Sequence, residues 1–210
     1  NDLIQFLDFL KSYDESLLFI DIDKSVIQQY IQRISKSDLS DKTVLRKVST
    51  IKSFYKFLMI NDLIEFNVME LISSPKVSKR IPNYLSKKEI QLLMNLPDLS
   101  TYRGNMHRSI LELFYSTGMR LSELVSIKTC NVNFNKQVIK ILGKGRKQRI
   151  VILGNEALKS LKDYLNYDRG YKNHYIYPSL INKSKHLSVN YVYKMVKKYL
   201  SKITNNEKMS

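Results

Sequence analysis

The chain has 210 residues, of which 43% are hydrophobic and 26% charged, an ordinary globular composition that suits one large or two small domains. No apolar run approaches the ~20 residues that span a bilayer, and no signal peptide opens the chain, so we expect a cytoplasmic protein without membrane contact. The single cysteine, Cys130, excludes an intramolecular disulfide. It shares no ligand spacing with the three histidines, so no zinc site is expected.

The net charge of +16 is distributed unevenly along the chain. Residues 1–74 carry 9 Lys and Arg against 11 Asp and Glu, whereas residues 75–210 carry 26 against 8, a net of +18. An excess of that size on an ordinary core favours a polyanion as partner. The alternative is an AT-rich genome, which inflates lysine and would also explain the abundant Ile and Asn. Composition therefore indicates nucleic acid as a class of partner and no particular reaction.

The first 73 residues are predicted to form a small domain of four helices. Apolar residues recur at helical spacing from Leu3 to Leu10, and Ser40 or Asp41 is placed to cap the longest helix. The three later helices are expected at residues 23–34, 40–60 and 68–72.

The helix expected at residues 40–60 is predicted to have an apolar back and a cationic front, taking 100° per residue. The apolar face holds Leu45, Val48, Ile51, Tyr55 and Leu58, and the opposite face holds Lys42, Arg46, Ser49 and Lys56. A cationic front suits a helix that lies on DNA, although a merely solvated charged face is the alternative.

Residues 73–82 are predicted to be an exposed linker, because two prolines and three cations interrupt any apolar periodicity. Lys79 and Arg80 of this segment are expected to contact DNA. Ser86 then begins a new helix as its N-cap, with Glu89 as the capping-box partner. Later helices are expected at residues 108–116, 121–127, 156–167 and 189–202, and strands at 137–142, 148–153 and 175–177.

The most informative stretch is Thr117-Gly118-Met119-Arg120-Leu121-Ser122-Glu123-Leu124. Gly118 suits the left-handed turn that ends a helix, and Arg120 follows it at a junction between two helices, flanked by apolar residues. A guanidinium held in this way presents a planar fork suited to two phosphate oxygens. An ordinary surface pair between Arg120 and Glu123 is the alternative.

This octet resembles the first conserved box of the tyrosine site-specific recombinases of the phage integrase family, with Met119 where that box has leucine. The preceding helix also looks like the family's lead-in helix, and the likeness is greatest to the Xer-type recombinases. The resemblance implies a mainly α fold, with a four-helix, SAM-like core-binding domain followed by an α-rich catalytic domain with a small antiparallel sheet, the DNA breaking-rejoining enzyme fold. We expect these domains at residues 1–73 and 85–210, joined by a linker at 74–84.

The stretch Gly143-Lys144-Gly145-Arg146-Lys147, between two β-branched runs, is similar to the hairpin that follows this box in the family. The resemblance makes Lys144 the catalytic lysine. A flexible ammonium at a hairpin tip can hand a proton to a departing oxygen. Arg146 and Lys147 are expected to contact DNA beside it. A merely basic hairpin is the alternative, whereas a phosphate-binding P-loop is excluded because its motif is absent.

The family also needs a His-x-x-Arg box and, beyond it, a tyrosine nucleophile. None of the three histidines begins such a box, so we expect the catalytic domain to be incomplete here, with the nucleophile outside this chain. Tyr191, Tyr193 and Tyr199 precede the expected place of the box, in a helix that looks like a packing element, and none of them is named as nucleophile.

The resemblance implies that the complete protein recombines DNA at specific sites through a 3′-phosphotyrosyl intermediate and needs no metal or nucleotide cofactor. Arg120 would stabilise the phosphorane charge, Lys144 would protonate the leaving oxygen, and Glu123 would brace Arg120 from behind. The expected partners are double-stranded DNA, enclosed by the two domains, and further copies or relatives in a tetramer on paired sites at the nucleoid. Two alternatives remain: a DNA-binding relative without catalysis, acting as an accessory or regulator, and a type IB topoisomerase.

Overall fold

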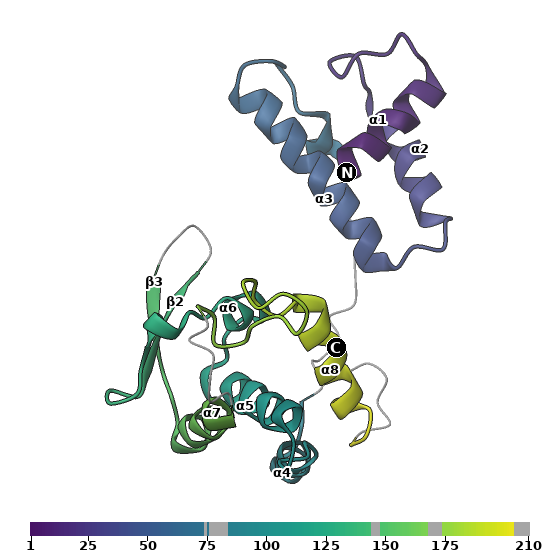
Figure 1. The fold of residues 1–210 in the computed structure, drawn as a ribbon. Helices are drawn as coiled ribbons and strands as arrows, with labels where there is room; N and C mark the ends of the chain where they lie inside the picture. The colour runs from purple at the N-terminus through teal and green to yellow at the C-terminus, as the bar shows by residue number, and fades with distance from the viewer. Residues whose placement is uncertain (74, 76–83, 144–147, 168–173, 204–210) are drawn as a thin grey trace. The chain divides into compact units, whose positions relative to one another are not determined.

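The computed structural model describes residues 1–73, 75, 84–143, 148–167 and 174–203, and the chain divides into two units, Asn1–Ile81 and Pro82–Ser210 (Figure 1). Both units are mainly helical, and the second also holds a small three-stranded antiparallel sheet, which confirms the predicted fold class. The limits predicted for the linker stay a prediction, because most of that segment lies outside the described residues. In the described ranges, no helix combines the length and apolar character needed to cross a membrane.

Three α-helices and one short turn of 3₁₀ helix make up the described part of the first unit. They are α1 (Asp2–Tyr13), α2 (Lys24–Ser35), α3 (Asp41–Ile60) and the 3₁₀ turn Val68–Leu71. The side chain of Asp23 caps α2 by accepting from the Val26 amide at 2.9 Å, and that of Ser40 caps α3 by accepting from Thr43. The fourth predicted helix is therefore only one 3₁₀ turn, which the Asn67 side chain starts by accepting from the Met69 amide.

An aromatic and aliphatic core joins the helices of the first unit. Phe6 of α1 packs edge-on against Tyr30 of α2, with ring centroids 5.0 Å apart, and Val48, Ile51 and Tyr55 of α3 are buried against them. The predicted apolar face of α3 is correct at these three positions. The buried face differs from the predicted one at its edges, because Val44 is buried whereas Leu45 and Leu58 are only half-buried.

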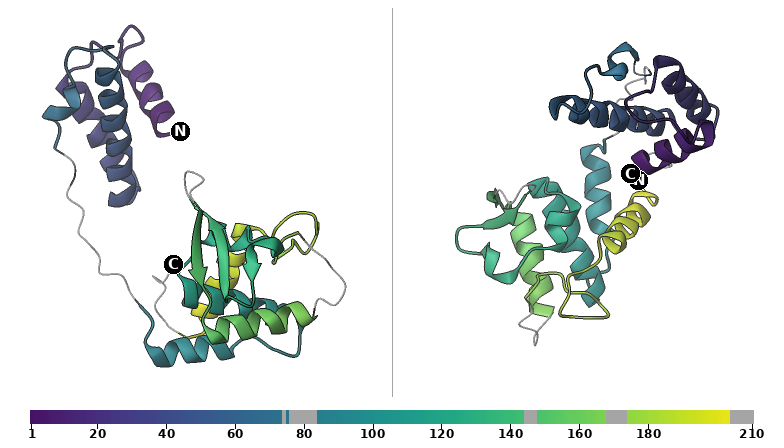
Figure 2. Two further views of the ribbon diagram at one scale, coloured as in Figure 1. Left: turned by 90° about the vertical axis from the view of Figure 1, so that its left-hand side faces the viewer. Right: turned by 90° about the horizontal axis from the view of Figure 1, so that it is seen from above.

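In its described residues, the second unit contains five α-helices and a hairpin-based sheet. The helices are α4 (Lys87–Asn95), α5 (Tyr102–Thr117), α6 (Leu121–Val125), α7 (Asn155–Tyr167) and α8 (Val189–Leu200). Strands β2 (Val138–Leu142) and β3 (Gln148–Ile152) pair antiparallel as predicted, and β1 (Val132–Asn133) adds a two-residue strand that periodicity did not reveal. Figure 2 shows the sheet and its helices from two further sides.

The strand predicted at residues 175–177 is wrong. Tyr175 forms only an isolated bridge with Lys128, and the next two residues turn to different neighbours. The Ile176 amide donates to the Ile127 carbonyl at 2.9 Å, while the Tyr177 carbonyl accepts from Leu187 at 2.7 Å. The apolar character of this segment reflects burial in the core rather than membership of a ladder.

Helix α5 is the central element of the second unit, with a continuous buried stretch from Ser109 to Leu113 and with α7 running alongside it (Figure 1). It begins earlier than predicted, capped by Thr101. Gly104 allows its first turn to lie against the backbone of Asp98, where an added Cβ would come within 1.8 Å of the carbonyl oxygen. Its C-terminal turn, at Gly118, sets the position of Arg120 before α6.

Candidate DNA-binding and catalytic site

The turn between α5 and α6 fixes the backbone of Arg120. Gly118 ends α5 in the left-handed conformation, with φ of 57°, and its amide donates to the Phe114 carbonyl at 3.0 Å. The next residue, Met119, is buried in the core and anchors the chain. Arg120 then stands immediately before α6 in an extended conformation, as predicted from the octet. Its side chain is 67% exposed, so the guanidinium is accessible from solvent.

The Glu123 carboxylate lies behind Arg120 and has all of its acceptor positions occupied. One oxygen accepts from Arg120 Nη1 at 3.1 Å and from Arg149 Nη1 at 2.7 Å. The other accepts from the Arg120 backbone amide at 2.7 Å and from Arg149 Nη2 at 2.9 Å. A carboxylate offers about four acceptor sites, so Glu123 is saturated.

Burial and these hydrogen bonds act on the acidity of Glu123 in opposite directions. Its side chain is only 4% exposed, and burial alone would raise the pKa of the carboxyl group. The hydrogen bonds from Arg149 and from the backbone and side chain of Arg120 outweigh that effect and hold the pKa below its ordinary value. Glu123 is therefore ionised at neutral pH and can orient both guanidinium groups.

The hairpin of β2 and β3 contacts this carboxylate through Arg149. Arg149 was not among the site residues predicted from the sequence. Arg149 is the second residue of β3 and pairs with Ile141 across the ladder. Lys144, Arg146 and Lys147 lie outside the described residues, so their predicted roles stay predictions. A cation inside an otherwise apolar strand was the available signal for Arg149, but its partner is 26 positions earlier in the chain and no local pattern reveals it.

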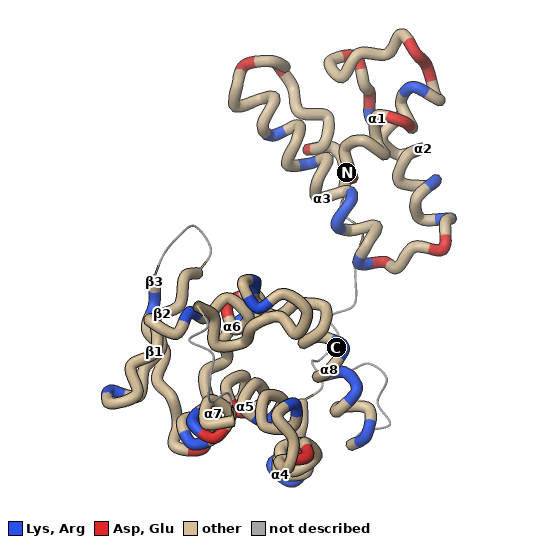
Figure 3. Tube along the Cα trace, viewed as in Figure 1, with Lys and Arg blue, Asp and Glu red and all other residues tan. Residues whose placement is uncertain are grey.

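The cationic face of α3 is exposed as predicted, at Lys42, Arg46, Ser49 and Lys56. Figure 3 shows the Lys and Arg positions along the trace of α3 in blue. Arg46 forms an ion pair with Asp2 of α1, and the same carboxylate accepts from the buried Lys47. The Ser49 hydroxyl donates to the Leu45 carbonyl within the helix. Lys79 and Arg80 lie outside the described residues. Lys42 and Lys56 are therefore the cations of this face that have no ion pair in the described part of the chain.

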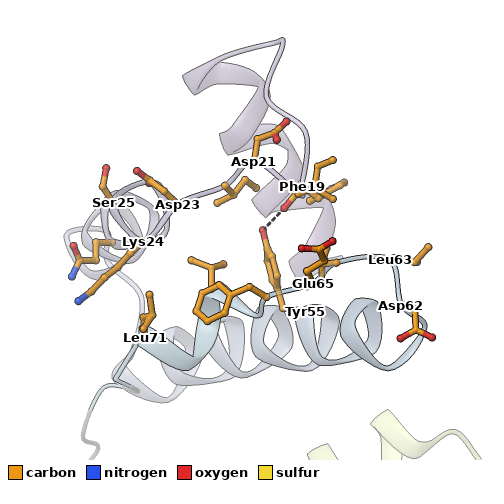
Figure 4. Close-up of a pocket in the computed structure, with 16 residues that line it drawn as sticks. Phe19, Asp21, Asp23, Lys24, Ser25, Tyr55, Asp62, Leu63, Glu65 and Leu71 are labelled. Atoms are coloured by element: carbon orange, nitrogen blue, oxygen red, sulfur yellow. Dashed lines mark hydrogen bonds between the residues drawn. The ribbon is translucent and has the colours of Figure 1, made fainter.

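A groove of about 1000 Å³ lies on another side of α3, and the charged residues that line it are four carboxylates and one lysine, Lys24. Figure 4 shows Asp21 and Asp23 on one side and Asp62 and Glu65 on the other, with the Tyr55 hydroxyl between them donating to the Phe19 carbonyl at 3.2 Å. At 100° per residue, Tyr55 lies about half a turn around α3 from Arg46. Because carboxylates repel phosphate, the two sides of α3 differ sharply in their suitability for DNA.

The buried His107 forms a cluster with two half-buried tyrosines of α8, a contact that was not predicted from the sequence. Its ring nitrogens hydrogen-bond with the hydroxyl of Tyr199 at 3.0 Å and that of Tyr191 at 2.9 Å, joining α5 to α8. Burial, and then the positive charges of Arg103 and Lys198, lower the pKa of His107 to about 4. Burial raises the pKa of both tyrosines. The cluster lies roughly 15 Å along α5 from the turn before Arg120, so it is a separate feature.

Comparison with known protein families identifies the family of both units. The model of the phage integrase family matches residues 83–210, and that of the phage integrase N-terminal SAM-like domain matches residues 1–61. This chain belongs to the phage integrase family. The resemblance noted in the octet and the hairpin is therefore confirmed, as is the SAM-like nature of the first unit. In the described ranges, no group of three His, Cys, Asp or Glu side chains is placed to hold a metal ion.

Curated relatives of this family member include Xer-type tyrosine recombinases. The chain is 40% identical over 140 residues to tyrosine recombinase XerC of Bacillus subtilis, covering 67% of this chain and 46% of that protein. It is 36% identical over 154 residues to tyrosine recombinase XerD of Staphylococcus haemolyticus, covering 73% of this chain and 52% of that protein. The chain thus spans about half the length of the curated relatives it matches.

Solved structures share the fold. The XerH site-specific recombinase bound to a palindromic difH substrate matches with a TM-score of 0.70 at 19% identity, covering 96% of this chain and 60% of that one. The XerA recombinase matches with a TM-score of 0.52 at 25% identity, covering 96% and 68%. At 19% identity, the likeness to the XerH structure is evidence for the fold alone.

Proposed function

We propose that the complete protein is a site-specific tyrosine recombinase that cuts and rejoins duplex DNA. The observation that carries this proposal is the exposed guanidinium of Arg120, held from behind by a buried, ionised Glu123 within a family-matching domain. Relatives named tyrosine recombinases and neighbours solved on DNA support the same substrate. An ordinary surface pair would have two exposed partners, whereas here only the arginine is accessible.

The proposed reaction is a pair of transesterifications at a backbone phosphate. A tyrosine attacks phosphorus, which leaves a 3′-phosphotyrosyl link and a free 5′-hydroxyl, and a 5′-hydroxyl from a partner duplex reverses the step. Arg120 stabilises the charge of the pentacovalent phosphorus, and Lys144 protonates the departing oxygen. Bond energy is retained throughout, so the reaction as proposed requires no nucleotide cofactor. Four copies or relatives on two paired sites, at the nucleoid, would complete the assembly.

Residues 1–210, by themselves, are proposed to bind DNA without cleaving it. The sequence contains no His-x-x-Arg box, and neither Tyr191 nor Tyr199 is suited to attack phosphorus. Their hydroxyls are engaged by His107 and their pKa values are raised, whereas a nucleophile needs an available and activated oxygen. Both units, with limits near 73 and 85, are proposed to contact the duplex.

A nicked duplex tests the absence of cleavage. A substrate with a nick beside the scissile phosphate loses its 5′-hydroxyl strand and traps any covalent complex. We expect residues 1–210 to shift this duplex in a native gel and to leave no protein–DNA band after detergent. A band that survives detergent would show that a working nucleophile lies within these residues. Failure to shift any duplex would contradict DNA binding itself, whereas binding without cleavage by the complete protein would favour an accessory or regulatory relative.

A further inference from the structure

We infer that Arg149 is a positioning residue, which orients the Arg120 guanidinium through the carboxylate of Glu123 that the two arginines share. The inference rests on the proposed function only in assigning phosphate as what Arg120 binds. The geometry itself is independent of that assignment. Arg149 forms a two-bond fork on Glu123, at 2.7 and 2.9 Å, while Arg120 uses one guanidinium nitrogen and its backbone amide.

Arg149 supplies the stronger half of this arrangement. Two parallel N–H bonds from one guanidinium fix both the position and the plane of a carboxylate, whereas the Arg120 guanidinium gives only one bond and the second bond from Arg120 comes from its backbone amide. Because the Glu123 oxygens are held by Arg149, the remaining acceptor directions meet the Arg120 amide and Nη1. The rest of the Arg120 guanidinium then remains available to an incoming anion. Without Arg149, a buried carboxylate would keep only the contacts from Arg120, and the two would be free to move together.

Arg149 also connects elements that are distant in the chain. It stands on β3, directly after the segment that carries the predicted catalytic Lys144, while Glu123 stands on α6. The pair is therefore a direct side-chain link between the loop end of the hairpin ladder and the turn that presents Arg120. The edge of the Arg149 guanidinium formed by its two terminal nitrogens already faces Glu123, so this edge is not open for a two-bond contact with phosphate.

The titration of Glu123 in residues 1–210 tests this inference without requiring any activity. Glutamate labelled with ¹³C at Cδ reports its own ionisation by NMR, and Glu123→Gln identifies the signal. We expect Arg149→Met to raise the titration midpoint of Glu123 by about one pH unit or more, and Arg149→Lys to raise it less, because the charge is kept and the fork is lost. The ¹⁵Nε signal of Arg120 should shift in the same order.

A matched control is Arg108→Met. Arg108 pairs with the buried Glu112 in the same unit, at 2.9 Å, and does not contact Glu123. Its loss should lower the melting temperature while leaving the Glu123 midpoint and the Arg120 signal unchanged. If Arg149→Met also leaves the Glu123 midpoint and the Arg120 signal unchanged, the positioning role is refuted. If the Met variant does not fold, the same result with Arg149→Lys refutes it.

Adding duplex DNA separates this inference from the proposed function. In the wild-type chain, DNA should move the Arg120 signal, and in Arg149→Met that response should fall several-fold at equal protein occupancy. If DNA leaves the wild-type signal unmoved but the Glu123 midpoint rises in the variant, the positioning role stands and the phosphate assignment fails. If DNA moves the signal equally in both proteins and the midpoint is unchanged, the positioning role fails and the proposed function stands.

Discussion

The cationic face of α3 leads to a quantitative prediction about DNA affinity. Lys42 and Lys56 are exposed and have no ion pair in the described ranges, whereas Arg46 is paired with Asp2. We therefore choose the double variant Lys42→Gln, Lys56→Gln, which removes two unpaired cations without disturbing the pair on α1. The matched control is Lys11→Gln, Lys36→Gln, which removes the same charge from exposed positions at the C-terminal ends of α1 and α2.

The magnitude follows from counterion release. Each phosphate neutralised by a cation contributes about −0.9 to the slope of log K against log salt, which corresponds to roughly 8-fold in affinity at 0.1 M salt. If the wild-type chain contacts on the order of 8 phosphates, its slope is near −7. The α3 variant should then have a slope near −5 and bind about 60-fold more weakly at 0.1 M salt, with the difference disappearing towards 1 M salt.

Fluorescence anisotropy with a labelled duplex, over a series of salt concentrations, measures both quantities. The control pair should change affinity by less than about 3-fold and leave the slope nearly unaltered, because its charges lie away from the α3 face. Equal losses in both double variants would mean that only net charge matters. DNA binding would then belong to residues 75–210, and the first unit would have no docking face.

Three further outcomes are expected. In the complete protein, Arg120→Ala or Lys144→Ala should slow DNA cleavage by ~10²–10³-fold and leave DNA binding nearly intact. A parallel loss of DNA binding would mean that these two residues are ordinary phosphate contacts. The pKa of His107 is lowered from 6.5 to about 4, so the folded state binds fewer protons than the unfolded state between these pH values. The free energy of unfolding should therefore fall as the pH drops through this window, by at most about 3 kcal/mol. In urea titrations, His107→Gln should lack this pH dependence. Gly104→Ala should lower the free energy of unfolding by more than about 2 kcal/mol, because the new Cβ meets the Asp98 backbone, whereas Gly118→Ala should lower it by only about 1 kcal/mol. Equal urea midpoints for the two variants would contradict the close approach of α5 to Asp98.

Local signals in the sequence were sufficient for most helices. The capping box at Ser86 and Glu89 is formed as predicted, with the Ser86 amide donating to Glu89 at 2.7 Å, and Ser40 caps α3. Such contacts span three or four residues, so residue type and spacing contain the information. The turn at Gly118 was predictable for the same reason, because only its own backbone conformation is involved.

Features that depend on distant partners were not predictable in this way. Tyr175 was expected in a strand, but its apolar neighbours are buried against α5 and α7 rather than in a ladder. His107 lies 84 and 92 positions from the tyrosines that bind it. Lys47 was not predicted to be buried, because its partners Asp2 and Gln5 belong to another helix. In each case a pattern along one element cannot specify which other element covers it.

The arrangement around Arg120 combines both kinds of information. Three local features place the arginine within a single turn of chain. They are the left-handed Gly118, the buried Met119 and the hydrogen bond that the Arg120 amide donates to Glu123. A buried glutamate, however, must be compensated to remain ionised, and Arg120 gives it only one guanidinium bond because most of that side chain is exposed. The remaining compensation comes from a strand 26 residues later. The octet therefore specifies where the arginine proposed to bind phosphate lies, and the fold of the hairpin onto α6 determines that its carboxylate partner stays charged.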